Sequence, residues 1–90
     1  MKKILHLTLF RRWFDEIAAG TKCTEYRAKT DFWTRRLIGR EYDEVHFRNG
    51  YARNAPFMRV EFLGVGDAQW DGEECFGIRL GKILEIRNVP

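Results

Sequence analysis

The sequence is poor in cysteine and proline and contains no long hydrophobic run. Its two cysteines, Cys23 and Cys75, do not form a C-x-x-C motif. The apolar stretch behind Met1 is broken at His6 and again at Arg11, which makes it too short for the hydrophobic region of a signal peptide. We therefore expect reduced thiols rather than a disulfide framework. Because no run approaches the roughly 18 residues of a membrane span, we expect a cytoplasmic protein without a membrane partner.

The usual metal and cofactor motifs are also missing. His6 and His46 are not combined with the cysteines at the spacing of zinc ligands. The chain has no glycine-rich phosphate loop and no nucleophile elbow. We expect the protein to need neither a metal ion nor another cofactor.

The charge balance points weakly toward an anionic partner. Sixteen basic residues against thirteen acidic ones leave a net charge of +3, and eleven of the sixteen are arginine. Arginine presents a planar set of donors that suits phosphate and base contacts, so a nucleotide or a nucleic acid is a candidate partner. A solvated surface explains the same arginines equally well. A charge of +3 is small for a nucleic-acid binder, which favours a small-molecule ligand.

The hydrophobic content is sufficient for one folded domain. Hydrophobic residues make up 44% of the 90 residues, and a chain of this length buries about 60% of the surface that its unfolded form exposes. We expect residues 1–90 to form a single domain, and we exclude a disordered chain.

Alternation of apolar and polar residues predicts six strands. Gly64 and Gly66 are expected to break or bulge one of them, and Gly81 is expected to separate the last two. The predicted strands cover 2–9, 22–28, 44–48, 57–65, 75–80 and 82–87.

A helical period predicts two short helices between these strands. The first begins at Arg11 and ends at Gly20, which is suited to the left-handed conformation. The second is capped by Thr30 or Asp31 and stops at Gly39. Together the elements predict an α+β fold: a small, closed or nearly closed, mostly antiparallel β-barrel of about six strands whose ends the helices cover.

The densest polar cluster runs from the end of the first helix into the second strand, over 20–27. On a strand, Glu25 and Arg27 share one face, while Lys22 and Thr24 share the other. Lys22 lies at the mouth of the strand, so its long side chain is able to reach Glu25. A partly desolvated lysine beside a carboxylate is suited to proton transfer or to oxyanion stabilisation. A surface ion pair on an edge strand is the alternative interpretation.

A second polar cluster covers 47–56. The amide of Asn49 is able to read the Watson–Crick edge of a base, Tyr51 to stack on it, and Arg48 to bind a carbonyl or phosphate. An ordered hairpin loop, in which Asn49 and Gly50 are chosen for positive φ, accounts for the same residues.

The remaining candidates are weaker. The three tryptophans are expected to serve as packing in the core or at its rim. The candidates for a further carboxylate that completes the site are Glu61, Asp71, Glu73 and Glu74.

Several motifs resemble those of the small ASCH-domain proteins, and the most specific is Gly20-x-Lys22-x-x-Glu25-x-Arg27. The similarity extends over nearly the whole chain. Its other elements are Leu5-His6-Leu7-Thr8-Leu9, Trp13-Phe14-Asp15, Phe32-Trp33-x-x-Arg36-Leu37, Phe47-Arg48-Asn49-Gly50-Tyr51, Asn54-Ala55-Pro56 and Ile78-x-Leu80-Gly81-Lys82-Ile83. The resemblance implies a PUA-like β-barrel, in agreement with the strand pattern.

The resemblance also implies two kinds of activity. ASCH domains were proposed to bind RNA, and some small single-domain members are amidohydrolases that deacylate N4-acetylcytidine and related N4-acylcytosines. The family's catalytic lysine corresponds to Lys22. The family's threonine corresponds to Glu25, with Thr24 beside it, and its glutamate has no clean counterpart.

Two mechanisms are compatible with this pattern. In one, Thr24 attacks the amide carbonyl after Lys22 takes its proton. In the other, which strand parity favours, Glu25 activates a water while Lys22 stabilises the oxyanion. Arg27, Asn49 and Tyr51 would orient the base and ribose of a modified nucleoside. RNA is the alternative partner, and a pocket that senses a nucleotide-like ligand without chemistry is a third interpretation.

Overall fold

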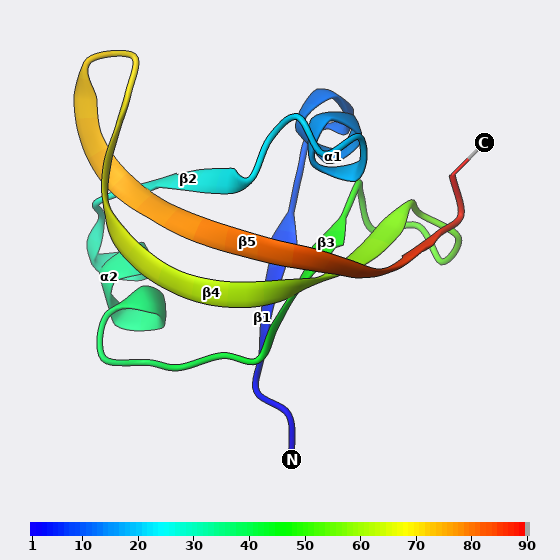
Figure 1. The fold of residues 1–90 in the computed structure, drawn as a ribbon, viewed down its shortest axis with the longest axis horizontal. Helices are drawn as coiled ribbons and strands as arrows, with labels where there is room; N and C mark the ends of the chain where they lie inside the picture. Colours follow the sequence, from blue (N-terminus) through cyan, green and yellow to red (C-terminus); the bar gives the residue numbers. More distant parts are fainter. Residues whose placement is uncertain (90) are drawn as a thin grey trace.

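Two short helices and a five-stranded sheet make up the computed structural model, which describes residues 1–89 (Figure 1). Helix α1 covers Arg11–Ala18 and α2 covers Asp31–Leu37. No helix in this part of the chain has the length and apolarity needed to cross a membrane. The strands are β1 (Ile4–Thr8), β2 (Thr24–Ala28), β3 (Glu44–Arg48), β4 (Phe57–Trp70) and β5 (Glu73–Arg87).

The strands are ordered β1-β3-β4-β5-β2 in the sheet. The pair β1–β3 is parallel and the other three pairs are antiparallel, which confirms a mostly antiparallel α+β fold. The long strands β4 and β5 form a curved hairpin (Figure 1). Its turn residues Asp71 and Gly72 have φ values of 51° and 79°, as a two-residue hairpin turn of this twist requires.

The sheet has five strands and is not closed, so the predicted barrel of about six strands is not confirmed. The two strands expected around Gly81 are one strand, β5: Gly81 has no positive φ, and the side chains of Glu61 and Leu63 pack where a Cβ at Gly81 would lie. Strand β4 also continues through Gly64 and Gly66 to Trp70. Between Arg59 and Gly64 the pairing of β4 with β5 shifts in register, as at a β-bulge.

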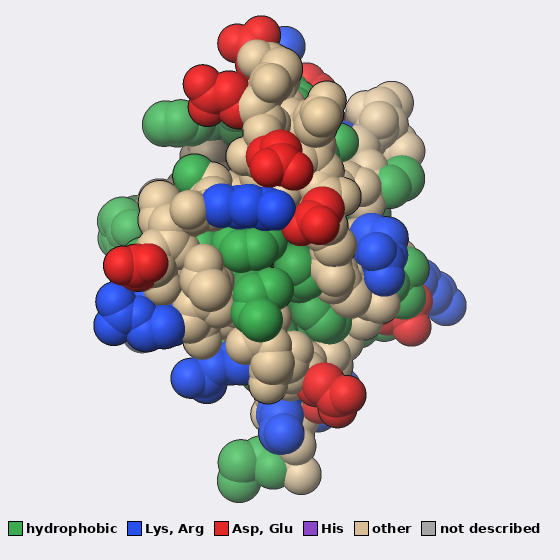
Figure 2. Space-filling view, turned by 90° about the vertical axis from the view of Figure 1, so that its left-hand side faces the viewer, with side chains coloured by type: hydrophobic (Ala, Val, Ile, Leu, Met, Phe, Trp, Pro, Cys, Tyr) green, Lys and Arg blue, Asp and Glu red, His purple; other side chains and the backbone are tan. Residues whose placement is uncertain are grey.

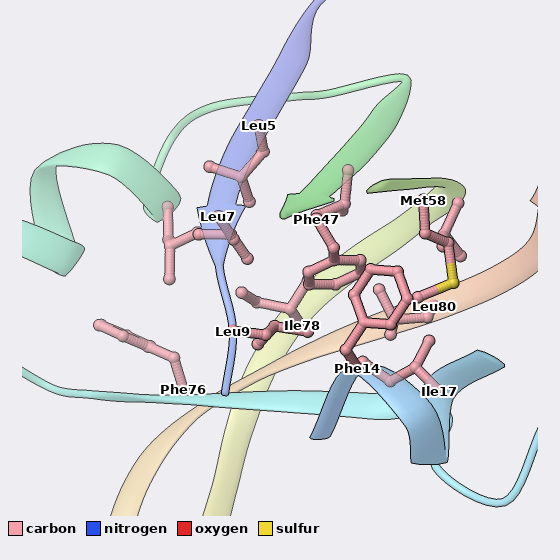
Figure 3. Close-up of a cluster of buried hydrophobic side chains, with 13 residues drawn as sticks. Leu5, Leu7, Leu9, Phe14, Ile17, Phe47, Met58, Phe76, Ile78 and Leu80 are labelled. Carbon is pink, nitrogen blue, oxygen red and sulfur yellow. The ribbon is translucent and has the colours of Figure 1, made fainter. Parts of the chain in front are cut away.

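The core lies between the sheet and the helices, and it is supplied by strands β1, β3, β4 and β5 together with α1 and Leu37 of α2 (Figure 3). The alternating apolar residues Leu5, Leu7, Val45 and Phe47 of β1 and β3 are all buried, so the alternation in these strands is confirmed. The remaining buried members of the cluster are Leu9, Phe14, Ile17, Leu37, Met58, Val60, Phe76, Ile78 and Leu80.

The ends of the helices confirm their predicted caps. Thr30 Oγ1 accepts a hydrogen bond of 3.2 Å from the backbone N–H of Trp33, which caps α2. Gly20 has a φ of 80°, so the chain turns sharply after α1 and enters β2 within a few residues. This turn sets the position of Lys22.

Strands β1 and β2 are the two edges of the sheet, and a side chain joins them. The Arg27 guanidinium on β2 donates a hydrogen bond of 3.1 Å to the backbone carbonyl of Thr8 at the end of β1. The sheet thus has an open seam between β1 and β2, where the Arg27 side chain bonds to β1 in place of a backbone ladder. The polar cluster over 20–27 lies at this seam.

Candidate active site

Lys22 and Glu25 form a largely buried ion pair at the start of β2. Lys22 Nζ donates a hydrogen bond of 2.7 Å to Glu25 Oε1, and the two side chains are only 11% and 6% exposed. The approach follows from the end of α1, where the backbone N–H groups of Thr21 and Lys22 both donate to the carbonyl of Glu16. The sequence spacing left open whether these two side chains meet. They do meet, and because the contact is shielded from water, the ionic interaction is stronger than it would be in bulk water.

Arg27 holds the other oxygen of the same carboxylate. Its Nε and Nη2 atoms lie 3.1 and 2.8 Å from Glu25 Oε2. Glu25 is paired in register with the fully buried Ile78, so its carboxylate is directed toward the interior of the fold. A buried carboxylate is tolerated there because two cations and three hydrogen bonds compensate its desolvation.

Aromatic rings support both cations. Lys22 Nζ lies 4.4 Å from the centre of the Trp13 ring and 5.8 Å from that of Tyr26. The Arg27 guanidinium carbon lies 4.9 Å from the centre of the Trp33 ring. These are cation–π distances, so α1, β2 and α2 together fix the position of the two charges around Glu25.

A cleft of about 220 Å³ opens beside Lys22. It is smaller than the roughly 300–1,000 Å³ of pockets for drug-sized ligands, which suits a single-ring group. The rings of Trp13 and Tyr26 lie 5.4 and 5.1 Å from that of Trp70, so the walls are aromatic. The lining residues are Trp13, Glu16, Thr21, Lys22, Cys23, Thr24, Tyr26 and Trp70.

Trp13 and Trp33 pack against the core, as predicted, and Trp13 and Trp70 also line the cleft. Trp70 is 48% exposed at the last paired position of the β4–β5 hairpin. It meets Trp13 of α1 only because the long hairpin curves over β2. The sequence signal for this, a tryptophan directly before the Asp71-Gly72 turn, does not indicate which surface the turn approaches.

Thr24 shares the cleft with Lys22, whereas Glu25 does not line it. Alternate residues of a strand point to opposite faces, and Thr24 accordingly lies on the face opposite to Glu25. The carboxylate contacts the cleft through the Lys22 ammonium. The arrangement is able to pass a proton from a cleft hydroxyl through an amine to a buried carboxylate.

The second predicted cluster lies elsewhere. The side-chain amide of Asn49 donates to the Leu9 carbonyl at 2.9 Å, and its backbone N–H donates to Pro56. Asn49 thus holds the end of β1. Of the two residues that the hairpin-loop interpretation expects at positive φ, Gly50 has a φ of 101°, whereas Asn49 is not in that region. Arg48 is exposed, Tyr51 is 88% exposed, and neither lines the cleft.

The carboxylates considered as a third site member also lie outside the cleft. Glu61 Oε1 accepts a hydrogen bond of 2.8 Å from the backbone N–H of Lys82. Glu16 is the acidic residue that lines the cleft. It was not among the predicted candidates, because these were all carboxylates from the second half of the chain. The others, all exposed at the β4–β5 turn, are Asp71, Glu73 and Glu74.

A separate charged cluster spans three strands on the other part of the sheet. Hydrogen bonds to Lys2, His46 and Arg59 lower the pKa of the buried Glu44 to about 2. Arg59 also donates to Glu85 at 2.9 Å. None of these residues lines the cleft beside Lys22, and no group of three or more potential metal ligands converges anywhere in residues 1–89.

A larger open groove of about 1750 Å³ lies between the end of α2, the segment before β3 and the middle of β4. It contains none of the predicted site residues. Figure 2 shows the side of the molecule with α2 and the β4–β5 turn, where hydrophobic side chains gather between charged ones. The groove's charged lining has both signs and no buried acid–base pair, so we place the chemistry in the smaller cleft. These charged residues are Lys3, Arg35, Arg40, Glu41 and Asp43.

Comparison with known proteins gave no match: no family model, no curated protein and no solved structure matches the chain. The resemblance to ASCH-domain proteins therefore remains a prediction. The function has to be argued from the geometry of the cleft.

Proposed function

We propose that the protein is an amidohydrolase that removes the acyl group from N4-acylcytidine-type nucleosides. The observation that carries the proposal is the 2.7 Å contact between Lys22 Nζ and Glu25 Oε1, largely buried and bordering a small aromatic cleft. A pair of titratable groups that is shielded from water and reaches one cleft is suited to proton transfer. The aromatic walls suit a planar base.

In the mechanism that the cleft favours, Thr24 is the nucleophile. Its Oγ attacks the acyl carbon and gives its proton to Lys22, which passes one of its own protons to Glu25 Oε1. The carbon–nitrogen bond then breaks, and the proton returns through Lys22 to the departing exocyclic nitrogen. Water hydrolyses the resulting Thr24 ester and releases the carboxylic acid.

The alternative, in which Glu25 activates a water directly, requires its carboxylate in the cleft. Glu25 lies behind Lys22, and two of its three hydrogen bonds come from Arg27. We therefore assign Glu25 to proton acceptance from Lys22 and to its positioning. Arg27 positions Glu25 in turn.

The primary test is conversion of N4-acetylcytidine to cytidine, followed by ultraviolet absorbance. Lys22→Ala is expected to lower kcat/KM by about 10²–10⁴-fold, the usual contribution of a proton-transfer group. Lys82→Ala is the matched control, because the Lys82 side chain makes no hydrogen bond or ion pair within residues 1–89. Absence of turnover by the folded wild-type protein, at high enzyme concentration and with several N4-acyl groups, would refute the proposal.

The nucleophile is tested by a threonine series. Thr24→Val keeps the shape but removes the hydroxyl, so it is expected to abolish turnover, whereas Thr24→Ser is expected to retain it. Mass spectrometry of quenched wild-type reactions is expected to detect one acyl group on the peptide that contains Thr24. Full activity of Thr24→Val would instead support direct attack by water.

RNA binding is the second candidate function, and one observation favours it. Six of the eleven arginines make no ion pair with a carboxylate within residues 1–89. Free guanidinium groups on a surface attract phosphates. Submicromolar RNA binding with a steep salt dependence is the expected result for this function, and no binding at low salt would exclude it. These arginines are Arg35, Arg36, Arg40, Arg48, Arg53 and Arg79.

A further inference from the structure

Arg79 is the free arginine that shares a sheet face with the cleft. Cross-strand partners in an antiparallel pair point to the same face. Thr24, which lines the cleft, is paired with Arg79, and Tyr26 is paired with Gly77. Arg79 therefore lies on the continuation of the surface on which a ligand in the cleft would rest.

The Arg79 guanidinium lies against the backbone of β4. A Cβ added at Gly64 would lie 2.8 Å from Arg79 Nη2, and one at Gly66 would lie 3.2 Å from Nη1. The side chain makes no hydrogen bond or ion pair with another side chain of residues 1–89, and it is exposed. Its donors are thus held in place by two glycines and remain available to an anion.

Two glycines, Gly66 and Gly77, lie between the cleft and this guanidinium, and the small side chains of Ala68 and Thr24 lie 3.0 and 3.3 Å from where a Cβ at Gly77 would be. Gly66 is paired with Gly77, which is paired with Tyr26. Two strand spacings separate Tyr26 from Gly66, or about 10 Å. A ribose is able to bridge such a gap between a base in the cleft and a phosphate at Arg79.

We propose that the ligand of this site is a nucleoside monophosphate, whose base occupies the aromatic cleft and whose phosphate is bound by Arg79. The identity of the base rests on the proposed function, whereas the phosphate contact rests on Arg79 alone. A guanidinium binds phosphate through charge-assisted hydrogen bonds, often two in parallel. Arg79 is then a residue that determines specificity and takes no part in proton transfer.

The test compares the binding of cytidine, cytidine 5′-monophosphate and cytidine 3′-monophosphate, measured by quenching of tryptophan fluorescence, because Trp13 and Trp70 line the cleft. At least one monophosphate is expected to bind about tenfold or more tightly than cytidine, as one charge-assisted hydrogen bond provides. Arg79→Ala is expected to remove this preference. The matched control is Arg53→Ala, another free and exposed arginine, which is expected to leave it unchanged.

A second variant tests the position of the guanidinium without removing it. Gly66→Ala puts a methyl group where Arg79 Nη1 now packs, so the preference for the monophosphate is expected to fall while cytidine binding is retained. Equal binding of cytidine and both monophosphates, or an unchanged preference in Arg79→Ala, would overturn the inference.

The two proposals fail in distinguishable ways. Turnover of N4-acetylcytidine without a preference for phosphate would refute the role of Arg79 and leave the hydrolase intact. A preference for phosphate that depends on Arg79, without turnover of any N4-acyl compound, would support the binding site and refute the hydrolase. If neither cytidine nor its monophosphates bind, the role of Arg79 is refuted, and the hydrolase is then decided by turnover of N4-acetylcytidine alone.

Discussion

At the scale of single residues, Glu25 is the most constrained group of the site. Its carboxylate is 6% exposed and accepts hydrogen bonds from Lys22 and Arg27. Removing one member of such a cluster leaves its partners as uncompensated buried charges. Stability and chemistry therefore depend on the same carboxylate, and variants of it must be tested for folding before activity.

We expect Glu25→Ala to destabilise the fold by about 3–5 kcal/mol, the usual cost of breaking a buried ion pair. Urea denaturation followed by circular dichroism measures the change. Glu73→Ala, at the exposed hairpin turn, is the control and is expected to change stability by less than about 0.5 kcal/mol. Equal stability of the two variants would show that Glu25 is solvated.

The sequence showed that Lys22 is able to reach Glu25, because the two are only three positions apart, but it left open whether the pair is buried or lies on the surface. The burial follows from the helix end before them, which directs the lysine along the strand. The contribution of Trp70 was not predictable in this way. It depends on the curvature of a long hairpin, which alternation and turn residues do not determine.

At the scale of elements, the pattern predicted the glycine positions only in part. Gly64 and Gly66 were expected to break or bulge a strand, and the pairing of β4 with β5 does shift in register next to Gly64, but both glycines lie inside β4. Gly81 was expected to separate two strands, but it lies inside β5. Each leaves room for a neighbouring side chain: the first two for Arg79, and Gly81 for Glu61. A glycine that ends a strand and one that admits a close neighbour have the same local sequence signal.

The cluster around Glu44 predicts how β3, β4 and β5 respond to acid. Lys2, His46 and Arg59 lower the pKa of Glu44 from 4.5 to about 2, so the folded state prefers the charged carboxylate. The stability that it contributes is fully present above pH 4.5 and is lost as the pH falls through about 2. Thermal unfolding between pH 6 and pH 2 measures this loss.

The matched variant is Glu44→Gln, which removes the titrating group. We expect it to be less stable than the wild type at pH 6 and to show a smaller loss of stability between pH 4.5 and pH 2. The same acid dependence in both proteins would contradict the assignment, since other carboxylates would then account for it.

At the scale of the whole molecule, the open sheet is held together at its seam by side chains. Residues of β1 and β2 have no ladder to each other. The Arg27 guanidinium of β2 joins them by donating to the Thr8 carbonyl of β1, and it also donates to Glu25 of its own strand. The guanidinium donates three hydrogen bonds, two to Glu25 and one to Thr8, which explains why this residue is an arginine. Lysine has a single nitrogen and cannot reproduce the planar, bidentate arrangement.

We therefore expect Arg27→Lys to keep the positive charge but loosen the seam. Hydrogen exchange measured by mass spectrometry is expected to accelerate in peptides that contain the ends of β1 and β2, by about tenfold if one net hydrogen bond of about 1.4 kcal/mol is lost. Arg87→Lys is the control, because Arg87 forms an exposed 3.4 Å ion pair with Glu85 and lies 4.2 Å from the centre of the Phe57 ring, and within residues 1–89 it donates no hydrogen bond to β1 or β2. Unchanged exchange in Arg27→Lys would mean that the packing of Leu9 and Ile78 in the core, rather than the guanidinium, holds the two edges together.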